Sequence, residues 1–170
     1  MTKSSKRFSH AIFGAAFTVV LALTLIATPE PADAQSRYGK QKVVYHINYD
    51  NPKRQKGALI NIQNHINAVG KENLDLKVVL HGNGLALLLE PDSLPQLKRF
   101  KHANADLNMT ARVDELKLQG VEFNVCQNTI KGRKVDLAND MYDVDDQDVV
   151  PSGVAEVARL QQMGYAYIKP

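Results

Sequence analysis

The sequence predicts a single α/β domain in which helices cover both faces of a mostly parallel sheet. Short β-rich segments alternate along the chain with segments that carry apolar residues at helical spacing, and this order is typical of parallel sheets. The length of 170 residues fits one domain. Apolar residues make up 44% of the chain and charged residues 23%, which is the composition of an ordinary globular protein.

The first 34 residues have the features of a secretory signal peptide. Three basic residues open the chain, an uncharged run follows over residues 11–27, and Ala32 and Ala34 supply the small residues of a cleavage site. The alternative is a membrane anchor, but the uncharged run is at the short limit for crossing a bilayer. We therefore expect a mature chain that begins at Gln35, is periplasmic, and has no stable membrane insertion after cleavage.

Four segments of the mature chain are expected to form strands. Residues 42–49 are β-rich, residues 74–80 (L-D-L-K-V-V-L) are expected to form the second strand, and residues 121–126 alternate strictly between apolar and polar side chains. A short terminal strand is expected at residues 165–168. Residues 35–41, ahead of the first strand, have the composition of a flexible lead-in.

Helical spacing and end signals predict the layers that cover the sheet. Apolar residues recur every three or four positions after the first strand until Gly70, which is a stop signal. Ser152 can cap the last helix, and Gly164 follows its expected end. The expected helices cover residues 53–69, 85–89, 97–102, 110–118 and 152–163.

Charge and composition exclude several classes of function. From Gln35 onward, 18 basic and 16 acidic side chains leave a net charge of +2, which is too small and too evenly spread for a nucleic-acid binder. The acidic segment at residues 136–148 does not fit a calcium loop, because with Asp143 as first ligand Asp148 replaces the required glycine and Val154 the required glutamate. We expect this segment to be a solvated acidic loop. One cysteine and scattered histidines argue against zinc. We expect no metal and no cofactor.

The candidate ligand-binding residues follow two of the expected strands. In open α/β sheets, ligands bind beyond the carboxyl ends of the strands. The glycines after the second strand can bring backbone amides close to an anion, although a plain strand-to-helix turn explains them equally well. The pattern is no dinucleotide fingerprint, because the third glycine is missing. The predicted ligand-binding residues are His81, Gly82, Asn83, Gly84, Gln127, Asn128 and Thr129.

Cys126 is the only cysteine and the candidate catalytic residue. The alternation of its strand places it on one face with Glu122 and Asn124, at the edge where ligands bind. Backbone amides beyond the strand and the basic residues within 131–134 favour a thiolate. We therefore expect an exposed thiol with a lowered pKa, the lowering limited by the charge of Glu122. The alternative is a buried cysteine that acts as a small hydrophobic residue.

Two histidines are candidate acid or base groups, because histidine changes its charge near neutral pH. His81 follows the second strand directly, and His46 lies within the first. A packed polar side chain explains either residue, and for His46 it is the favoured interpretation.

Three stretches of the sequence, taken together, resemble the DsrE/DsrF-like family. They are V-V-L-H-G-N-G-L-A-L-L, G-V-E-F-N-V-C-Q-N-T-I and V-V-P-S-G-V-A-E-V-A-R-L-Q-Q-M-G-Y-A-Y-I-K-P. The first strand and its helix extend the resemblance to residues 42–170. It implies a Rossmann-like three-layer α/β/α fold with about five strands, and assembly into a homo-oligomer. In sulfur-relay members a cysteine at the end of a central strand carries sulfur as a persulfide, a role that falls by position on Cys126.

Two functions follow as hypotheses. The first is a sulfurtransferase-like carrier, in which Cys126 passes sulfane sulfur between donor and acceptor thiols, a partner protein supplies or receives the sulfur, and His81 or nearby amides steady the anion. The second is a non-catalytic exported oligomer that binds a small ligand or serves in assembly. A reactive thiol supports the first hypothesis and an inert thiol the second. The best-known relay members are cytoplasmic, so the signal peptide argues against their partners and against tRNA thiolation.

Overall fold

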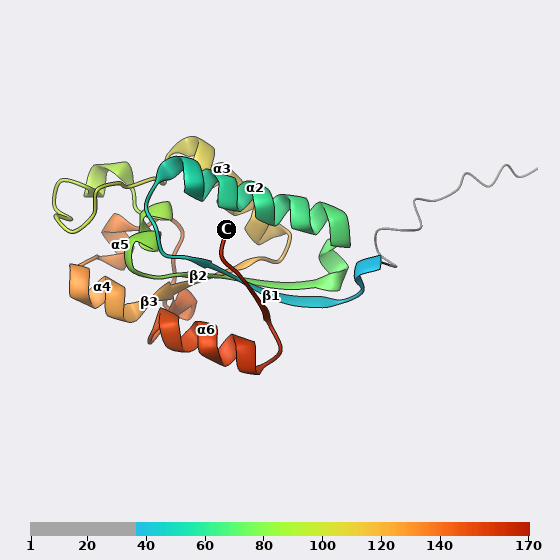
Figure 1. Ribbon diagram of the computed structural model, residues 1–170. Coiled ribbons are helices and arrows are strands. Elements are labelled where there is room, and N and C mark those ends of the chain that lie inside the picture. Colours follow the sequence, from blue (N-terminus) through green and yellow to red (C-terminus); the bar gives the residue numbers. More distant parts are fainter. Residues whose placement is uncertain (1–36) are drawn as a thin grey trace, which may run out of the picture. The chain divides into compact units, whose positions relative to one another are not determined.

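The computed structural model describes residues 37–170, so the predicted signal peptide and its cleavage site lie outside the described residues. Five strands form one sheet in the order β4-β3-β2-β1-β5, and every neighbouring pair is parallel (Figure 1). The predicted parallel sheet is therefore confirmed. The strands are β1 (Gln41–Ile47), β2 (Leu74–Leu80), β3 (Glu122–Cys126), β4 (Val149–Val150) and β5 (Ala166–Ile168).

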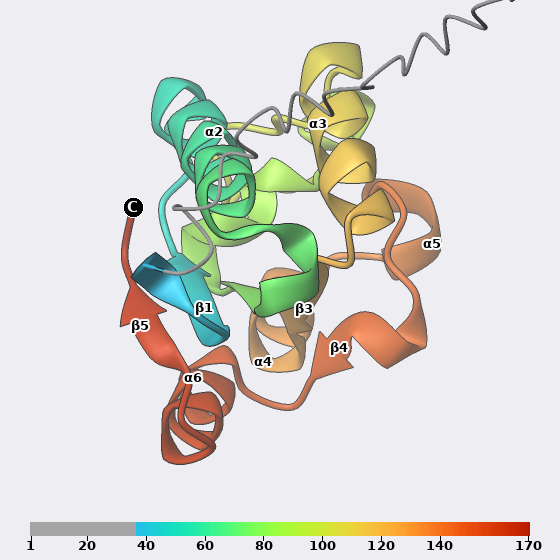
Figure 2. The same ribbon diagram turned by 90° about the vertical axis from the view of Figure 1, so that its right-hand side faces the viewer.

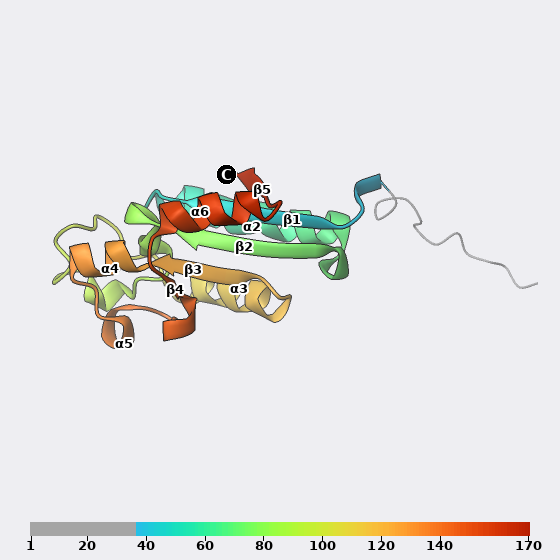
Figure 3. The ribbon, with the colours of Figure 1, turned by 90° about the horizontal axis from the view of Figure 1, so that it is seen from below.

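Helices cover both faces of this sheet, which confirms the predicted three layers. Figure 2 shows α2 and α3 on one face and α6 on the other. Seen from below in Figure 3, α6 lies over β1 and β2, and β3 and β4 run beside it. No helix within residues 37–170 is long and apolar enough to cross a membrane. The helices are α2 (Pro52–Val69), α3 (Leu107–Leu118), α4 (Gln127–Arg133), α5 (Leu137–Asp140) and α6 (Gly153–Gln162).

The ends of α2 and α6 follow from the capping residues that the sequence offers. The Asn51 side chain accepts a hydrogen bond from the backbone N–H of Arg54 at 3.0 Å, and Pro52 begins α2. Ser152 caps α6 in the same way. Gly70 follows the last residue of α2 with a φ of +86°, a conformation that favours glycine.

Three of the predicted elements differ from the structure. A short helix was expected at residues 85–89, and the helix found there is a 3₁₀ helix that begins three residues earlier and spans Gly82–Leu87. Residues 97–102 form only turns. The acidic segment was expected to be a loop, and it contains α5, which Asp136 caps by accepting from the backbone N–H groups of Ala138 and Asn139.

Two apolar cores of unequal size lie on the two faces of the sheet. Alternate residues of β1, β2 and β3 join α2 and α3 in the large core, which includes Phe123 and Val125. The small core under α6 contains only Val44, Val79, Val157, Leu160 and Tyr165. The face that carries α6 is therefore the polar face of the sheet, and both Cys126 and Glu122 belong to it by alternation.

Candidate functional site

The sheet register brings His81 and Cys126 together at the carboxyl ends of β2 and β3. Leu80 pairs with Val125, so the next residue of each strand continues side by side. The backbone N–H of His81 donates to the carbonyl of Ile47 at 3.2 Å, which ties the end of β2 to the end of β1. The predicted edge of the sheet therefore does gather the two residues.

Cys126 is the last residue of β3 and the N-cap residue of α4. Burial raises the pKa of its thiol, but hydrogen bonds from the Thr129 hydroxyl and from the backbone N–H groups of Gly153, Thr129 and Asn128 outweigh burial and lower the pKa below its usual value. The lowered pKa agrees with the sequence prediction. Its cause is a cradle of donors from the starts of α4 and α6, rather than the basic side chains within 131–134.

The hydroxyl of Thr129 is oriented by the turn that follows β2. The backbone N–H of Gly82 donates to Thr129 Oγ1 at 3.0 Å, which leaves the hydroxyl proton free to be donated to the Cys126 sulfur. Gly82 has a φ of +58°, in the left-handed region that favours glycine. The glycine-rich turn thus acts on the thiol through Thr129.

The prediction that Cys126 is exposed was wrong. The residue is only 2% exposed, because the start of α6 lies over it. A Cβ atom added to Gly153 would lie 2.8 Å from His81 Cβ and 3.2 Å from Cys126 Cβ, so no side chain fits at that position. Residue 153 must be glycine for α6 to bring its first N–H group close to the thiol.

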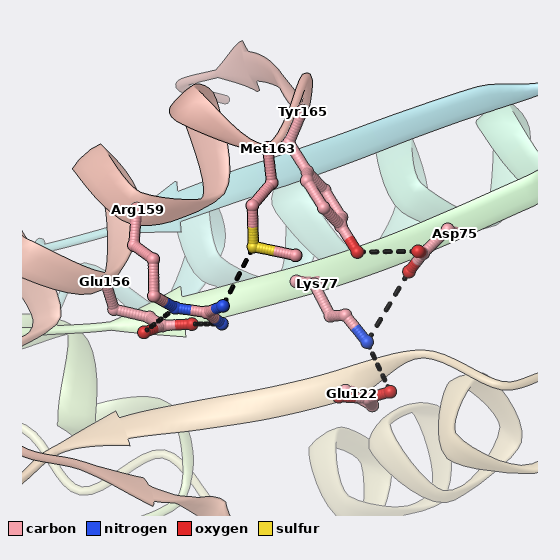
Figure 4. Close-up of polar contacts among 7 residues, drawn as sticks. All are labelled: Asp75, Lys77, Glu122, Glu156, Arg159, Met163 and Tyr165. Atoms are coloured by element: carbon pink, nitrogen blue, oxygen red, sulfur yellow. Dashed lines mark hydrogen bonds and ion pairs between the residues drawn. The ribbon is translucent and has the colours of Figure 1, made fainter.

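The expected opposition from Glu122 is also absent. Lys77 forms ion pairs with Glu122 and, at 3.4 Å, with Asp75 (Figure 4). The Tyr165 hydroxyl donates to Asp75 at 2.6 Å, and on α6 Arg159 binds Glu156 through two nitrogens. Glu122 also stands four residues before Cys126, about 13 Å along an extended strand, and it is not among the groups that shift the pKa of the thiol.

His46 and His81 form a hydrogen-bonded pair on the same face as Cys126. Nε2 of His46 lies 3.3 Å from Nδ1 of His81, and Nδ1 of His46 lies 3.1 Å from the Tyr167 hydroxyl on β5. Burial lowers the pKa of both histidines, and the cations Lys169 and, for His81, Arg133 lower it further. Both rings are therefore neutral at neutral pH. The expectation that His46 is a packed polar side chain fits its exposed fraction of 9%. That expectation did not include its hydrogen bond to His81.

The other predicted ligand-binding residues do not all lie beside Cys126. Asn128 and Thr129 point donors at Cys126, whereas Gln127 lines a separate hollow with Lys131 and Asp146. Asn83 is half-buried. Gly84 is fully buried and packs against the backbone of Ile47, so its role is to let two chain segments approach closely.

Sequence reasoning missed Gly153 and Tyr167 as members of this site. Tyr167 on β5 pairs with Val44 on β1, and Val44 stands two residues before His46 on the same face of the sheet. The closeness of Tyr167 to His46 could be predicted only from the order of the strands. Among residues 37–170, no group of three or more histidine, cysteine or carboxylate side chains is arranged to hold a metal ion.

We expect the stability of the domain to fall as the pH drops below about 6.5, the pKa of an unperturbed histidine. His46, His65 and His81 all have lowered pKa values, chiefly because of burial. Below that pH the unfolded chain takes up protons that the folded chain does not, so the free energy of unfolding decreases. Urea unfolding at pH 7.5 and 5.5 measures the effect. The control is His102→Gln, which changes a histidine at an exposed position. A free energy of unfolding that increases from pH 7.5 to pH 5.5 would contradict the prediction.

Comparison with known proteins connects this geometry to a family. A model of the DsrE/DsrF-like family matches residues 41–170. A solved structure of a protein of unknown function, MTH1491 from Methanobacterium thermoautotrophicum, is similar at 30% sequence identity and a TM-score of 0.59. The match covers 77% of this chain and 100% of that one. No curated protein matches the chain.

Proposed function

The chain belongs to the DsrE/DsrF-like family, which is associated with sulfur relay, and from this premise we propose that it is a periplasmic sulfur carrier. Cys126 receives sulfane sulfur from a donor, holds it as a persulfide, and passes it to an acceptor thiol. The observation that supports this proposal is the place of Cys126 at the end of β3, where the starts of α4 and α6 lie against it and where the Thr129 hydroxyl and the backbone N–H groups of Gly153, Thr129 and Asn128 lower the pKa of its thiol.

The cradle suits both ionic states of such a carrier. The thiolate is the nucleophile that attacks a sulfane donor, and its fraction rises as its pKa falls. Fixed N–H donors also stabilise the thiolate when it leaves in the transfer step, because they require no rearrangement as the charge develops. Both steps therefore benefit from the same donors.

Access to the thiol requires the start of α6 to move. Gly153 covers Cys126, whereas the preceding Pro151 is exposed and Ser152 is half-buried. A small shift of this short segment away from β3 opens the sulfur to a small persulfide or polysulfide. The proposal thus couples sulfur loading to local opening at the start of one helix.

Mass spectrometry of the native protein tests the proposed function. The protein is isolated from the periplasm without reducing agent, and the peptide that contains Cys126 is examined for the mass of one or more added sulfur atoms. Added sulfur on this residue is the expected result. A peptide that carries only free thiol, before and after incubation with polysulfide, would overturn the proposal.

Export is the second part of the proposal, and it rests on the signal-peptide pattern of residues 1–34. We expect the exported chain to begin at or near Gln35. N-terminal sequencing of the protein from the periplasmic fraction measures this directly. An intact Met1 in the membrane fraction would show that the segment is an anchor instead.

We also expect a homo-oligomer. On the face that carries α6, Glu122 is exposed and Asn124 half-buried, because α6 lies over β1 and β2 and leaves β3 beside it (Figure 3). A polar, partly covered strand next to the sheet edge suits a contact with a second copy. Light scattering at micromolar concentration should give at least twice the monomer mass, and a monomer mass would count against the prediction.

A further inference from the structure

The line formed by Tyr167, His46 and His81 runs from the molecular surface to the thiol. The Tyr167 side chain is 40% exposed, whereas His46 is 9% exposed and lies between Tyr167 and His81. A proton at the tyrosine hydroxyl can exchange with water, and each further step of the line is one hydrogen bond. The line therefore connects solvent with a buried part of the site.

His81 is the member of this line that stands next to Cys126. A Cβ atom added to Gly153 would lie 2.8 Å from the Cβ atom of His81 and 3.2 Å from that of Cys126. The two side chains therefore start beside each other. Neighbouring strands hold such residues about 4.8 Å apart. Nδ1 of His81 is occupied by His46, and Nε2 makes no hydrogen bond to any residue within 37–170. Nε2 is thus the ring atom available to a reactant at the thiol.

Two neutral arrangements of protons satisfy every hydrogen bond of the line. In the first, Tyr167 donates to His46, His46 donates to His81, and Nε2 of His81 carries a proton. In the second, His81 donates to His46, His46 donates to the tyrosine oxygen, and Nε2 of His81 is a free acceptor. The two arrangements differ by one proton step along each bond, with no charge on either ring.

We propose that Tyr167, His46 and His81 form a proton relay that serves the sulfur exchange at Cys126. This inference rests on the proposed function and names the groups that supply and remove its protons. His81 exchanges the proton with the reactant, while His46 and Tyr167 are positioning residues that connect His81 with water.

The relay supplies the proton that is needed in loading and takes up the proton that is released in unloading. In loading, the Cys126 thiolate attacks the outer sulfur of a persulfide R–S–SH, the S–S bond breaks, and the leaving R–S⁻ takes the proton from Nε2 of His81. In unloading, Nε2 accepts the proton of an acceptor thiol R′–SH, and the resulting thiolate attacks the outer sulfur of Cys126–S–SH. Products are R′–S–SH and the Cys126 thiolate. Each half leaves the line in the arrangement that the other half requires.

The charges around His81 explain why a relay suits this site better than a single histidine. Arg133 from α4 and Lys169 beyond β5 place positive charge near the ring. On α6 the one acidic residue of the first turn, Glu156, is held by Arg159. Burial of the ring first, and then these two cations, disfavour an imidazolium ion and lower the pKa of His81. Passing the proton on to water avoids storing that charge.

Sulfur release from loaded protein tests the relay. The full exported chain is loaded with polysulfide, excess is removed, and the rate of sulfur loss from Cys126 to 2-mercaptoethanol is followed by mass spectrometry between pH 6 and 8. We expect a nearly flat profile for the wild type. With polysulfide as the donor, the fragment that leaves in loading is a weakly basic polysulfide anion that needs no proton, so His81→Gln should still load fully. It should release sulfur about a hundredfold more slowly at pH 6.5, with a rate that rises about tenfold per pH unit as the probe ionises.

Tyr167→Phe keeps both histidines and breaks only the connection to water. It should also load fully, because loading from polysulfide needs no proton, and it should release sulfur about tenfold more slowly at pH 6.5. The control is His65→Gln, which removes a histidine hydrogen-bonded to Tyr45 at 3.1 Å on the opposite face of the sheet; its profile should match the wild type. If His81→Gln and Tyr167→Phe load and release as the wild type does, the relay is wrong and the carrier function stands. If the wild type takes up no sulfur, the carrier function fails and the relay with it.

Discussion

Cys126→Ser is expected to abolish sulfur loading completely and to leave the domain folded. A serine hydroxyl forms no persulfide, and Cys126 is the only cysteine in the chain. The donors of Gly153, Asn128 and Thr129 that lower the pKa of the thiol stay beside the hydroxyl, so the buried oxygen has groups to bond with. We expect the free energy of unfolding to change by about 1 kcal/mol. Intact-mass measurement after incubation with polysulfide, together with urea unfolding, checks both expectations.

A different result would favour the packed-cysteine alternative. If Cys126→Ser destabilises the domain by several kcal/mol, and if the wild-type thiol resists iodoacetamide at neutral pH, the residue is a core cysteine. The carrier function would then fail, and a non-catalytic binding or assembly role would become the better hypothesis.

Gly84→Ala is expected to destabilise the domain severely. A Cβ atom at this position would lie 1.9 Å from the carbonyl oxygen of Ile47 and 2.7 Å from its carbonyl carbon. Both are backbone atoms at the end of β1, so neither can rotate away as a side chain would. Overpacking of this kind costs about 3 kcal/mol or more, and the turn that orients Thr129 would be displaced with it.

Gly57→Ala is the matched control for Gly84→Ala, because Gly57 lies inside α2 and no atom stands within 4 Å of the added Cβ. Alanine favours a helix over glycine, so this variant should be as stable as the wild type or more stable by about 0.5–1 kcal/mol. Urea midpoints of the two variants give the comparison. Equal midpoints for Gly84→Ala and the wild type would show that the β1 backbone yields at little cost.

The sequence predicted the elements whose signals are local. Residues 74–80 coincide with β2, where Leu74 and Leu76 alternate with charged residues and lead into the apolar run at residues 78–80, a local pattern that is sufficient to indicate a strand. Ser152 and Gly164 bounded α6 correctly for the same reason. By contrast, β4 contains two residues and pairs only with the end of β3, so no pattern within it could reveal it.

The parts of the site that escaped prediction depend on contacts between distant segments. The burial of Cys126 depends on Gly153, and the hydrogen bond of His46 to Tyr167 joins residues 121 positions apart. The pKa of Cys126 was predicted in the right direction because a strand that leads into a helix brings backbone amides with it, and this is a local property. The third amide, from α6, follows only from the order of the strands.

The position of Gly153 above Cys126 also determines which covalent fates the thiol can have. A disulfide requires two sulfur atoms about 2.05 Å apart and Cα atoms within about 7 Å of each other. Two folded copies cannot bring their buried thiols that close while α6 covers each one. In an oxidising compartment a lone cysteine is otherwise prone to cross-link with other chains. The same helix start that supplies an amide to the thiolate therefore keeps the folded protein from becoming a covalent dimer, and any assembly must be held by non-covalent contacts.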